Sequence, residues 1–298
     1  LDAYANLGYR RRKNTGSALS EQTYLGSNTY QNYESDNERK GGNLFARAGL
    51  TWHMTKKDEL SLSGMTMMGE RDNLSTTPYR YGTVGAPTDS RVMFRRNTGE
   101  GDMRMYHAEL GYTHSFSDNH KLDLNVSFDR WKNDDDNYYQ DSTVFYDQPL
   151  PVEYSWQYRP MFINNRSWEV KADYENQLTE RLKLEAGYNG RFSHENTPQE
   201  SWADPTSWDG VARVEDRDYF NRFIYDMDVH AVYATLNAKL GRFGVMAGLR
   251  GEYWKVNTES YSWEQEHDAT LRDPAFSKDY FQLFPSLSLI HISEPTRR

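Results

Sequence analysis

Apolar and polar side chains alternate along most of this chain with a period of two residues. In one segment Ala108, Leu110 and Tyr112 alternate with Glu109 and Thr113. The same alternation recurs at residues 44–54, 60–63, 122–128, 168–174, 182–188, 232–240 and 245–250. A period of two is the mark of a β-strand whose two faces meet different surroundings. The pattern therefore predicts an all-β chain of about ten strands.

The segments between these strands are of two kinds. Short polar turns are predicted at 55–58, 117–120, 178–181 and 241–242, spaced 61 or 62 residues apart. Long polar stretches, interpreted as loops, lie at 69–102, 131–163, 193–220 and 258–277. Short turns at one end and long loops at the other are typical of a transmembrane β-barrel.

The distribution of charge along the strands agrees with this hypothesis. In hydrocarbon every backbone N–H and C=O needs a partner within the protein, so only helices and closed barrels cross a membrane. A tilted strand crosses in about 9–11 residues. The mid-strand charges fall on the polar set and would face a wet lumen: Arg47, Glu109, Asp123, Lys171 and Arg250. We therefore expect an antiparallel up-and-down barrel with outer-membrane lipid around it; the alternative is a soluble antiparallel sandwich.

Composition narrows the possible functions. Aromatic residues make up 14% of the 298 residues, which disfavours intrinsic disorder although 27% are charged. Mean hydropathy is −0.95. With no cysteine the chain has no thiolate chemistry, and its net charge of −9 disfavours nucleic acid as a partner. No motif for a cofactor or a catalytic site is present, so the prediction is a protein that is not an enzyme and needs no cofactor.

Several strand segments resemble a known family. Asn165–Tyr174 (Asn-Arg-Ser-Trp-Glu-Val-Lys-Ala-Asp-Tyr), Leu182–Tyr188, Asn221–Tyr225 and Gly248–Glu252 look like barrel strands of TonB-dependent outer-membrane receptors of the Bacteroidota type. Phe284–Ser286 (Phe-Pro-Ser) is similar to the same family. These are strand motifs, so they indicate a family and not a substrate.

The resemblance implies a barrel of about 22 strands, an N-terminal plug and a segment that engages the TonB complex. This chain contains only about ten strands and no plug, so we expect it to be a fragment of a larger barrel. The implied function is uptake of a scarce nutrient (a siderophore, peptide or oligosaccharide) through the outer membrane of a Gram-negative bacterium. The alternatives are a passive porin or adhesin barrel and a soluble protein that binds or cleaves glycans.

The C-terminal end of the chain resembles a translated DNA sequence that does not belong to a natural protein. Leu287–Arg297 (Leu-Ser-Leu-Ile-His-Ile-Ser-Glu-Pro-Thr-Arg) looks like one translated frame of a sequencing adapter. We therefore divide the chain into a barrel portion, residues 1–286, and a tail that is not native, residues 287–298.

Two loop segments carry candidate chemistry. Trp202, Asp204, Trp208 and Asp209 set two indoles among carboxylates, which could stack a sugar or another small nutrient ligand at the surface loops. Asp134, Asp135 and Asp136 group oxygen atoms of the kind that Ca²⁺ accepts, but without the spacing of a known calcium loop. Packing between loops and solvated loop surface are the simpler interpretations, and the prediction is that no metal binds.

Overall fold

Ten long β-strands dominate the computed structural model, which describes residues 1–291. They are β1 (Asp2–Tyr24), β2 (Thr29–His53), β3 (Asp58–Thr83), β4 (Arg91–Ser117), β5 (His120–Phe145), β7 (Met161–Thr179), β8 (Leu182–Gln199), β11 (Asn221–Leu240), β12 (Phe243–Tyr261) and β13 (Phe276–His291). The predicted strand number and the all-β class are confirmed.

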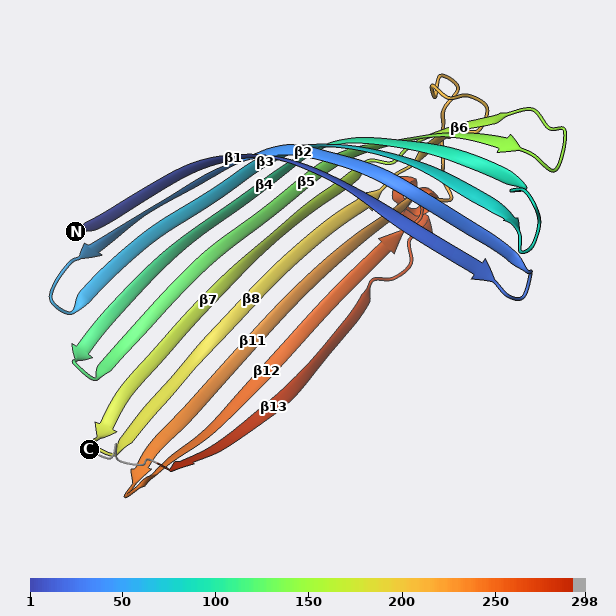
Figure 1. Ribbon diagram of the computed structural model, residues 1–298. Coiled ribbons are helices and arrows are strands. Elements are labelled where there is room, and N and C mark those ends of the chain that lie inside the picture. Colours follow the sequence, from blue (N-terminus) through green and yellow to red (C-terminus); the bar gives the residue numbers. More distant parts are fainter. Residues whose placement is uncertain (292–298) are drawn as a thin grey trace, which may run out of the picture.

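The ten strands form one antiparallel sheet in up-and-down order. Each long strand pairs with the next one along the chain, from β1 to β13. The sheet is strongly curved and remains open, because β1 and β13 lie at its two edges and do not pair with each other (Figure 1). This is the topology of an arc of an up-and-down barrel.

Three short strands extend the sheet at one end. β6 (Glu153–Tyr158) pairs with β5 and with β9 (Trp202–Asp204), and β9 pairs with β10 (Val214–Glu215). We call these strands and the loop 205–213 the annex. Between β12 and β13 lie a short helix, α1 (Trp263–His267), and a 3₁₀ turn, η1 (Ala269–Leu271). No helix within residues 1–291 is long and apolar enough to cross a membrane.

The four predicted short turns all lie at one end of the sheet. They join β2 to β3, β4 to β5, β7 to β8 and β11 to β12. At the turn between β2 and β3, the Thr55 hydroxyl accepts from the amides of Lys57 and Asp58, both at 3.0 Å. Such side-chain bonds close a polar turn without help from distant residues.

The interpretation of the polar stretches as loops is wrong for much of their length. β3 continues to Thr83 and β4 starts at Arg91, so most of 69–102 is strand; β5 likewise covers 131–145. Backbone pairing continues without interruption through these residues, from Gly69 opposite Met103 to Tyr81 opposite Arg91. Strands of up to 27 residues are more than twice the length a bilayer requires. The part of each strand that exceeds this length forms a polar extension of the sheet, at the end opposite the four short turns.

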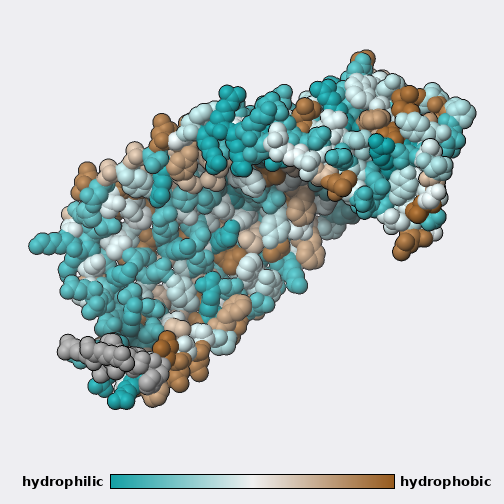
Figure 2. All heavy atoms as spheres, in the orientation of Figure 1, coloured by the Kyte–Doolittle hydropathy of each residue, from teal (hydrophilic) through white to brown (hydrophobic). Residues whose placement is uncertain are grey.

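The strands make a single layer, which decides between barrel and sandwich. Leu110 is 47% exposed, Leu124 40% and Leu236 41%, and within residues 1–291 no second sheet covers them. The opposite face of the sheet is mostly hydrophilic (Figure 2). The sandwich alternative is therefore wrong, because its apolar side chains would meet one another in a dry interior.

The predicted tail is divided in the structure. Residues 287–291 continue β13 and pair with β12, with Leu287 opposite Ala247. The remainder of the predicted tail, residues 292–298, lies outside the described residues.

Candidate ligand-facing surface

Two faces with opposite chemistry run the length of the sheet. Residues that pair directly share a face, and one such row is Leu62, Leu110, Val126 and Val170. Neighbouring residues along each strand point the other way. We call the first face outward and the second face inner.

The inner face carries its charges as close pairs. Lys171 Nζ lies 2.6 Å from Glu169, Lys121 Nζ 2.9 Å from Asp123, and Lys183 Nζ 2.8 Å from Glu175. These lie on the polar set predicted to face a lumen. An inner surface of paired charges suits water inside a pore, because each charge keeps both a counter-ion and access to solvent.

The predicted ligand residues Trp202, Asp204, Trp208 and Asp209 lie in the annex and pack against it. Trp202 stacks on Tyr158 with ring centroids 5.3 Å apart, and Trp208 meets Tyr154 edge-on at 6.2 Å. Trp202 pairs with Tyr158, and Tyr158 pairs with Tyr138 of β5. Tyr138 points outward, so the paired Tyr158 and Trp202 lie on the same outward face. The two indoles therefore do not face one common pocket on the inner side.

Asp204 is the organising residue of the annex. Its side chain is fully buried. One carboxylate oxygen accepts from Thr206 N at 2.9 Å and Thr206 Oγ1 at 2.8 Å, and the other from Ala212 N at 3.0 Å. A bond from the Ser207 hydroxyl, together with these bonds from Thr206 and Ala212, holds the pKa of Asp204 far below its ordinary range. Asp209 is exposed and accepts from Ser207 Oγ at 3.0 Å.

Asp134, Asp135 and Asp136 lie within β5, so alternation separates them. Asp135 points to the inner face, where Arg71 Nε donates to it at 3.1 Å. Asp134 and Asp136 are on the outward face, and Asp136 accepts from the Tyr158 hydroxyl. Within residues 1–291 no group of three or more acidic, histidine or cysteine side chains is placed to hold a metal ion.

The structure brings together a different set of side chains on the inner face of the long polar extension. Tyr and Arg side chains from four strands and two loops contact one another there, and we call them the Tyr–Arg ladder: Tyr33, Tyr79, Arg95, Tyr139, Arg159 and Tyr219. Tyr33 and Tyr79 have centroids 5.0 Å apart. Arg95 Cζ lies 5.9 Å from the centroid of the Tyr79 ring and 5.5 Å from the centroid of the Tyr139 ring. Sequence reasoning missed the ladder, because Tyr33, Tyr79, Arg95 and Tyr139 come from separate strands and meet only through register, while Arg159 and Tyr219 come from loops.

Arg95 anchors the ladder, and the guanidinium of Arg159 lies between two of its rings. Arg95 Nε and Nη2 each donate to Asp141 at 2.8 Å, and this pairing raises the pKa of the guanidinium. Arg159 lies 5.6 Å from the Tyr139 ring and 4.5 Å from the Tyr219 ring. Its Nε is buried without a hydrogen-bond partner among the described residues. A guanidinium that lies between aromatic rings can bind a flat or anionic group.

Comparison with known proteins places this architecture. The model of a family described as outer membrane protein beta-barrel family matches residues 114–295. No curated protein is similar enough in sequence to match the chain.

Three solved structures illustrate the structural similarity. The outer membrane protease OmpT of Escherichia coli has 9% identity, with 96% of this chain and 94% of that chain covered and a TM-score of 0.27. The ferric-catecholate import receptor Fiu of Escherichia coli K12 has 12% identity, 96% and 46% coverage and a TM-score of 0.49. The siderophore receptor PiuA of Acinetobacter baumannii has 8% identity, 95% and 47% coverage and a TM-score of 0.41. The chain thus spans less than half the length of these two receptors. Scores at this level carry no argument about function.

Proposed function

Because this chain belongs to the outer membrane protein β-barrel family and lies in the outer membrane, we propose that it forms part of the barrel of a TonB-dependent receptor for a scarce nutrient. The strand motifs at Asn165–Tyr174 and Gly248–Glu252 support the receptor assignment through their resemblance to that family. The proposal includes no catalytic site, no cofactor and no bound metal.

The open sheet supports a barrel larger than these ten strands. Unpaired backbone groups at an edge are costly in hydrocarbon. Both β1 and β13 have such an edge within their apolar segments. We propose that further strands of a longer polypeptide close the barrel, with an N-terminal plug that contacts the TonB complex.

The observation that carries the proposal is the Tyr–Arg ladder. It lies on the inner face beyond the apolar part of the strands, where a nutrient entering from outside would first meet the barrel. Aromatic faces stack flat groups or sugars, and guanidinium groups pair with carboxylates. A siderophore, a peptide or an oligosaccharide could each use these contacts. The annex residues Trp202 and Trp208 remain candidates for an outer contact of the same ligand.

Uptake in living cells tests the assignment. The complete polypeptide would be produced in a Gram-negative host that lacks its own nutrient receptors, with and without a functional TonB protein. We expect saturable uptake of one class among ferric siderophores, peptides and oligosaccharides, and its loss without TonB. Uptake that continues without TonB would instead establish a passive barrel.

A variant of the ladder tests where the ligand binds. Arg159→Gln should raise the half-saturation concentration roughly tenfold, the loss of one charge-assisted contact. Arg80→Gln is the matched control, since Arg80 is an exposed cation that pairs with Asp89 at 2.9 Å and lies outside the ladder. Equal half-saturation for Arg159→Gln and the unchanged protein would exclude the ladder as the binding surface.

A further inference from the structure

Four basic side chains gather on the outward face of three adjacent strands. Arg104 of β4 pairs directly with Lys132 of β5, and Arg130 of β5 pairs directly with Arg166 of β7. Arg130 and Lys132 are two residues apart on one strand and therefore share a face. We call these four residues the basic quartet.

The basic quartet lacks the counter-charges that the inner face provides. Like charges directly opposite each other on neighbouring strands are unfavourable. Arg104 has only Asp102, at 3.8 Å, and Arg130 donates to the amide oxygen of Asn164 at 3.2 Å. Within residues 1–291 no carboxylate lies within ion-pair distance of Lys132, Arg130 or Arg166. An anion from outside the chain would relieve this repulsion.

The position of the basic quartet along the strands defines its depth. The next outward residues toward the short turns are Tyr106, Phe128 and Trp168, followed by the apolar row. The next outward residues the other way are acidic: Asp102 and Asp134 pair directly. Short turns face the periplasm in outer-membrane barrels. The basic quartet therefore lies at the upper margin of the apolar band, at the depth of the headgroups of the outer leaflet.

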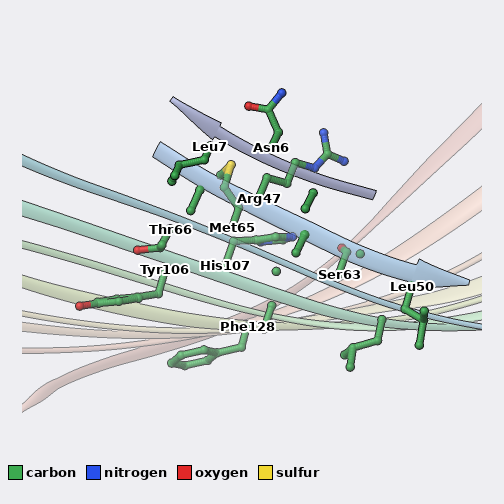
Figure 3. A pocket seen from close by; sticks show the side chains of 17 residues that line it. Asn6, Leu7, Arg47, Leu50, Ser63, Met65, Thr66, Tyr106, His107 and Phe128 are labelled. Carbon is green, nitrogen blue, oxygen red and sulfur yellow. The ribbon is translucent and has the colours of Figure 1, made fainter. Parts of the chain in front are cut away.

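An apolar groove lies beside the basic quartet on the same outward face. It has a volume of about 1010 Å³ and crosses β1 to β5 where small residues pair in a row: Ala5, Ala48, Gly64 and Ala108. Tyr106, Phe128 and Leu50 border it on one side of the strands, while Asn6 and Arg47 point to the other side (Figure 3).

A second hollow joins the groove to the basic quartet. It has a volume of about 440 Å³, shares Tyr106 with the groove and is lined by Arg104. This hollow is also lined by the carboxylates of Glu70 and Asp102. The apolar groove therefore continues to the guanidinium of Arg104, which lies beside two acidic groups.

We propose that the basic quartet and the groove together bind a phosphorylated lipid of the outer leaflet. The guanidinium and ammonium groups pair with the phosphate, and acyl chains fill the groove. Free phosphate would not use the groove, and a neutral lipid would not relieve the repulsion within the basic quartet. The carboxylates of Asp102 and Asp134 lie next to the basic quartet on the side away from the short turns. They repel phosphate there and so keep the headgroup at the depth of the basic quartet.

Lipid binding by the complete polypeptide tests this proposal. The protein, purified in mild detergent, would be titrated with phosphorylated lipid A, with its dephosphorylated form and with inorganic phosphate, and the bound species counted by native mass spectrometry. We expect binding of phosphorylated lipid A, at least tenfold weaker binding of the dephosphorylated form, and no saturable binding of inorganic phosphate. A variant with Arg104, Arg130, Lys132 and Arg166 all changed to Gln should bind phosphorylated lipid A at least tenfold more weakly.

Two further variants separate the specific site from general attraction. Arg191→Gln removes a cation from the inner face of β8 and should leave lipid binding unchanged. Ala108→Leu fills the groove and should weaken the binding of phosphorylated lipid A at least threefold. Equal binding of both lipid forms, or unchanged binding by the fourfold variant, would overturn the proposal.

Discussion

Among single residues, the buried carboxylate of Asp204 holds the annex loop in place. Asp204 satisfies backbone amides on both sides of the annex loop, from Thr206 to Ala212. A carboxylate that accepts several bonds in this way replaces the regular pairing that a loop lacks. As a ligand contact Asp204 stays a prediction; its side chain is fully buried in this structure.

We therefore expect Asp204→Ala to loosen the annex and leave the main sheet intact. The substitution leaves several buried donors without an acceptor. Amide hydrogen exchange in residues 202–215 should therefore accelerate roughly tenfold or more. Exchange measured by mass spectrometry checks this. Asp218→Asn, an exposed carboxylate nearby, should change nothing; equal protection in both variants would contradict this role of Asp204.

The turn at the periplasmic end should respond to acid. Hydrogen bonds from Thr55, His114 and Tyr112 lower the pKa of Asp58 from its ordinary value of 3.8 to about 2. Because the folded pKa lies below the unfolded one, the carboxylate stabilises the fold above about pH 4. That stabilisation is lost as pH falls from about 4 to 2. Carbon NMR of the carboxyl should show titration near pH 2; titration near pH 4 would show that these bonds do not form.

At the scale of elements, two glycines with positive φ have different surroundings. Gly241 has a φ of 63° and an added Cβ would meet nothing, whereas at Gly210, with a φ of 69°, it would overlap the Trp156 indole. Gly241→Ala should cost only the left-handed strain of about 1–2 kcal/mol. Gly210→Ala should in addition displace the loop from Trp156, seen as faster proteolysis at residues 205–213. Equal protease resistance of the two variants would contradict this difference.

The two faces of a strand should tolerate charge differently. Leu124 lies on the outward face of β5 and is 40% exposed, while Asn125 lies on the inner face and donates to Glu109 at 2.7 Å. Leu124→Arg should cost about 2–4 kcal/mol at mid-membrane. Asn125→Arg should cost less, since Glu109 can pair with it. Urea unfolding in lipid vesicles measures both, and equal costs would contradict the assignment of faces.

At the scale of the whole molecule, the open edges are the main physical problem. β1 pairs only with β2, so every second backbone amide of its 23 residues has no strand partner. These amides should exchange rapidly in the isolated 298-residue chain and be protected in the complete polypeptide. Exchange by NMR or mass spectrometry compares the two. Rapid exchange at the same positions in both would show that the barrel does not close through β1.

Much of the fold could be predicted because a strand records its surroundings locally. The alternation through Leu122–Phe128 reveals which side chains meet lipid, and the Thr55 turn closes with its own hydroxyl. The polar extensions were misjudged for a physical reason. Above the membrane both faces of a strand meet water, so residues 69–83 and 91–102 show no apolar period although their backbone pairing continues.

The alternation of side chains identified the apolar part of each strand, its two faces and the short turns, since each depends on neighbours within a few residues. Which distant side chains meet follows from the folded sheet alone. Tyr79, Arg95 and Tyr139 become a ladder, and Arg104 and Lys132 become neighbours, through the register of paired strands. Register is set by many backbone bonds acting together across the sheet, and a shift of one residue would turn each of these side chains to the opposite face.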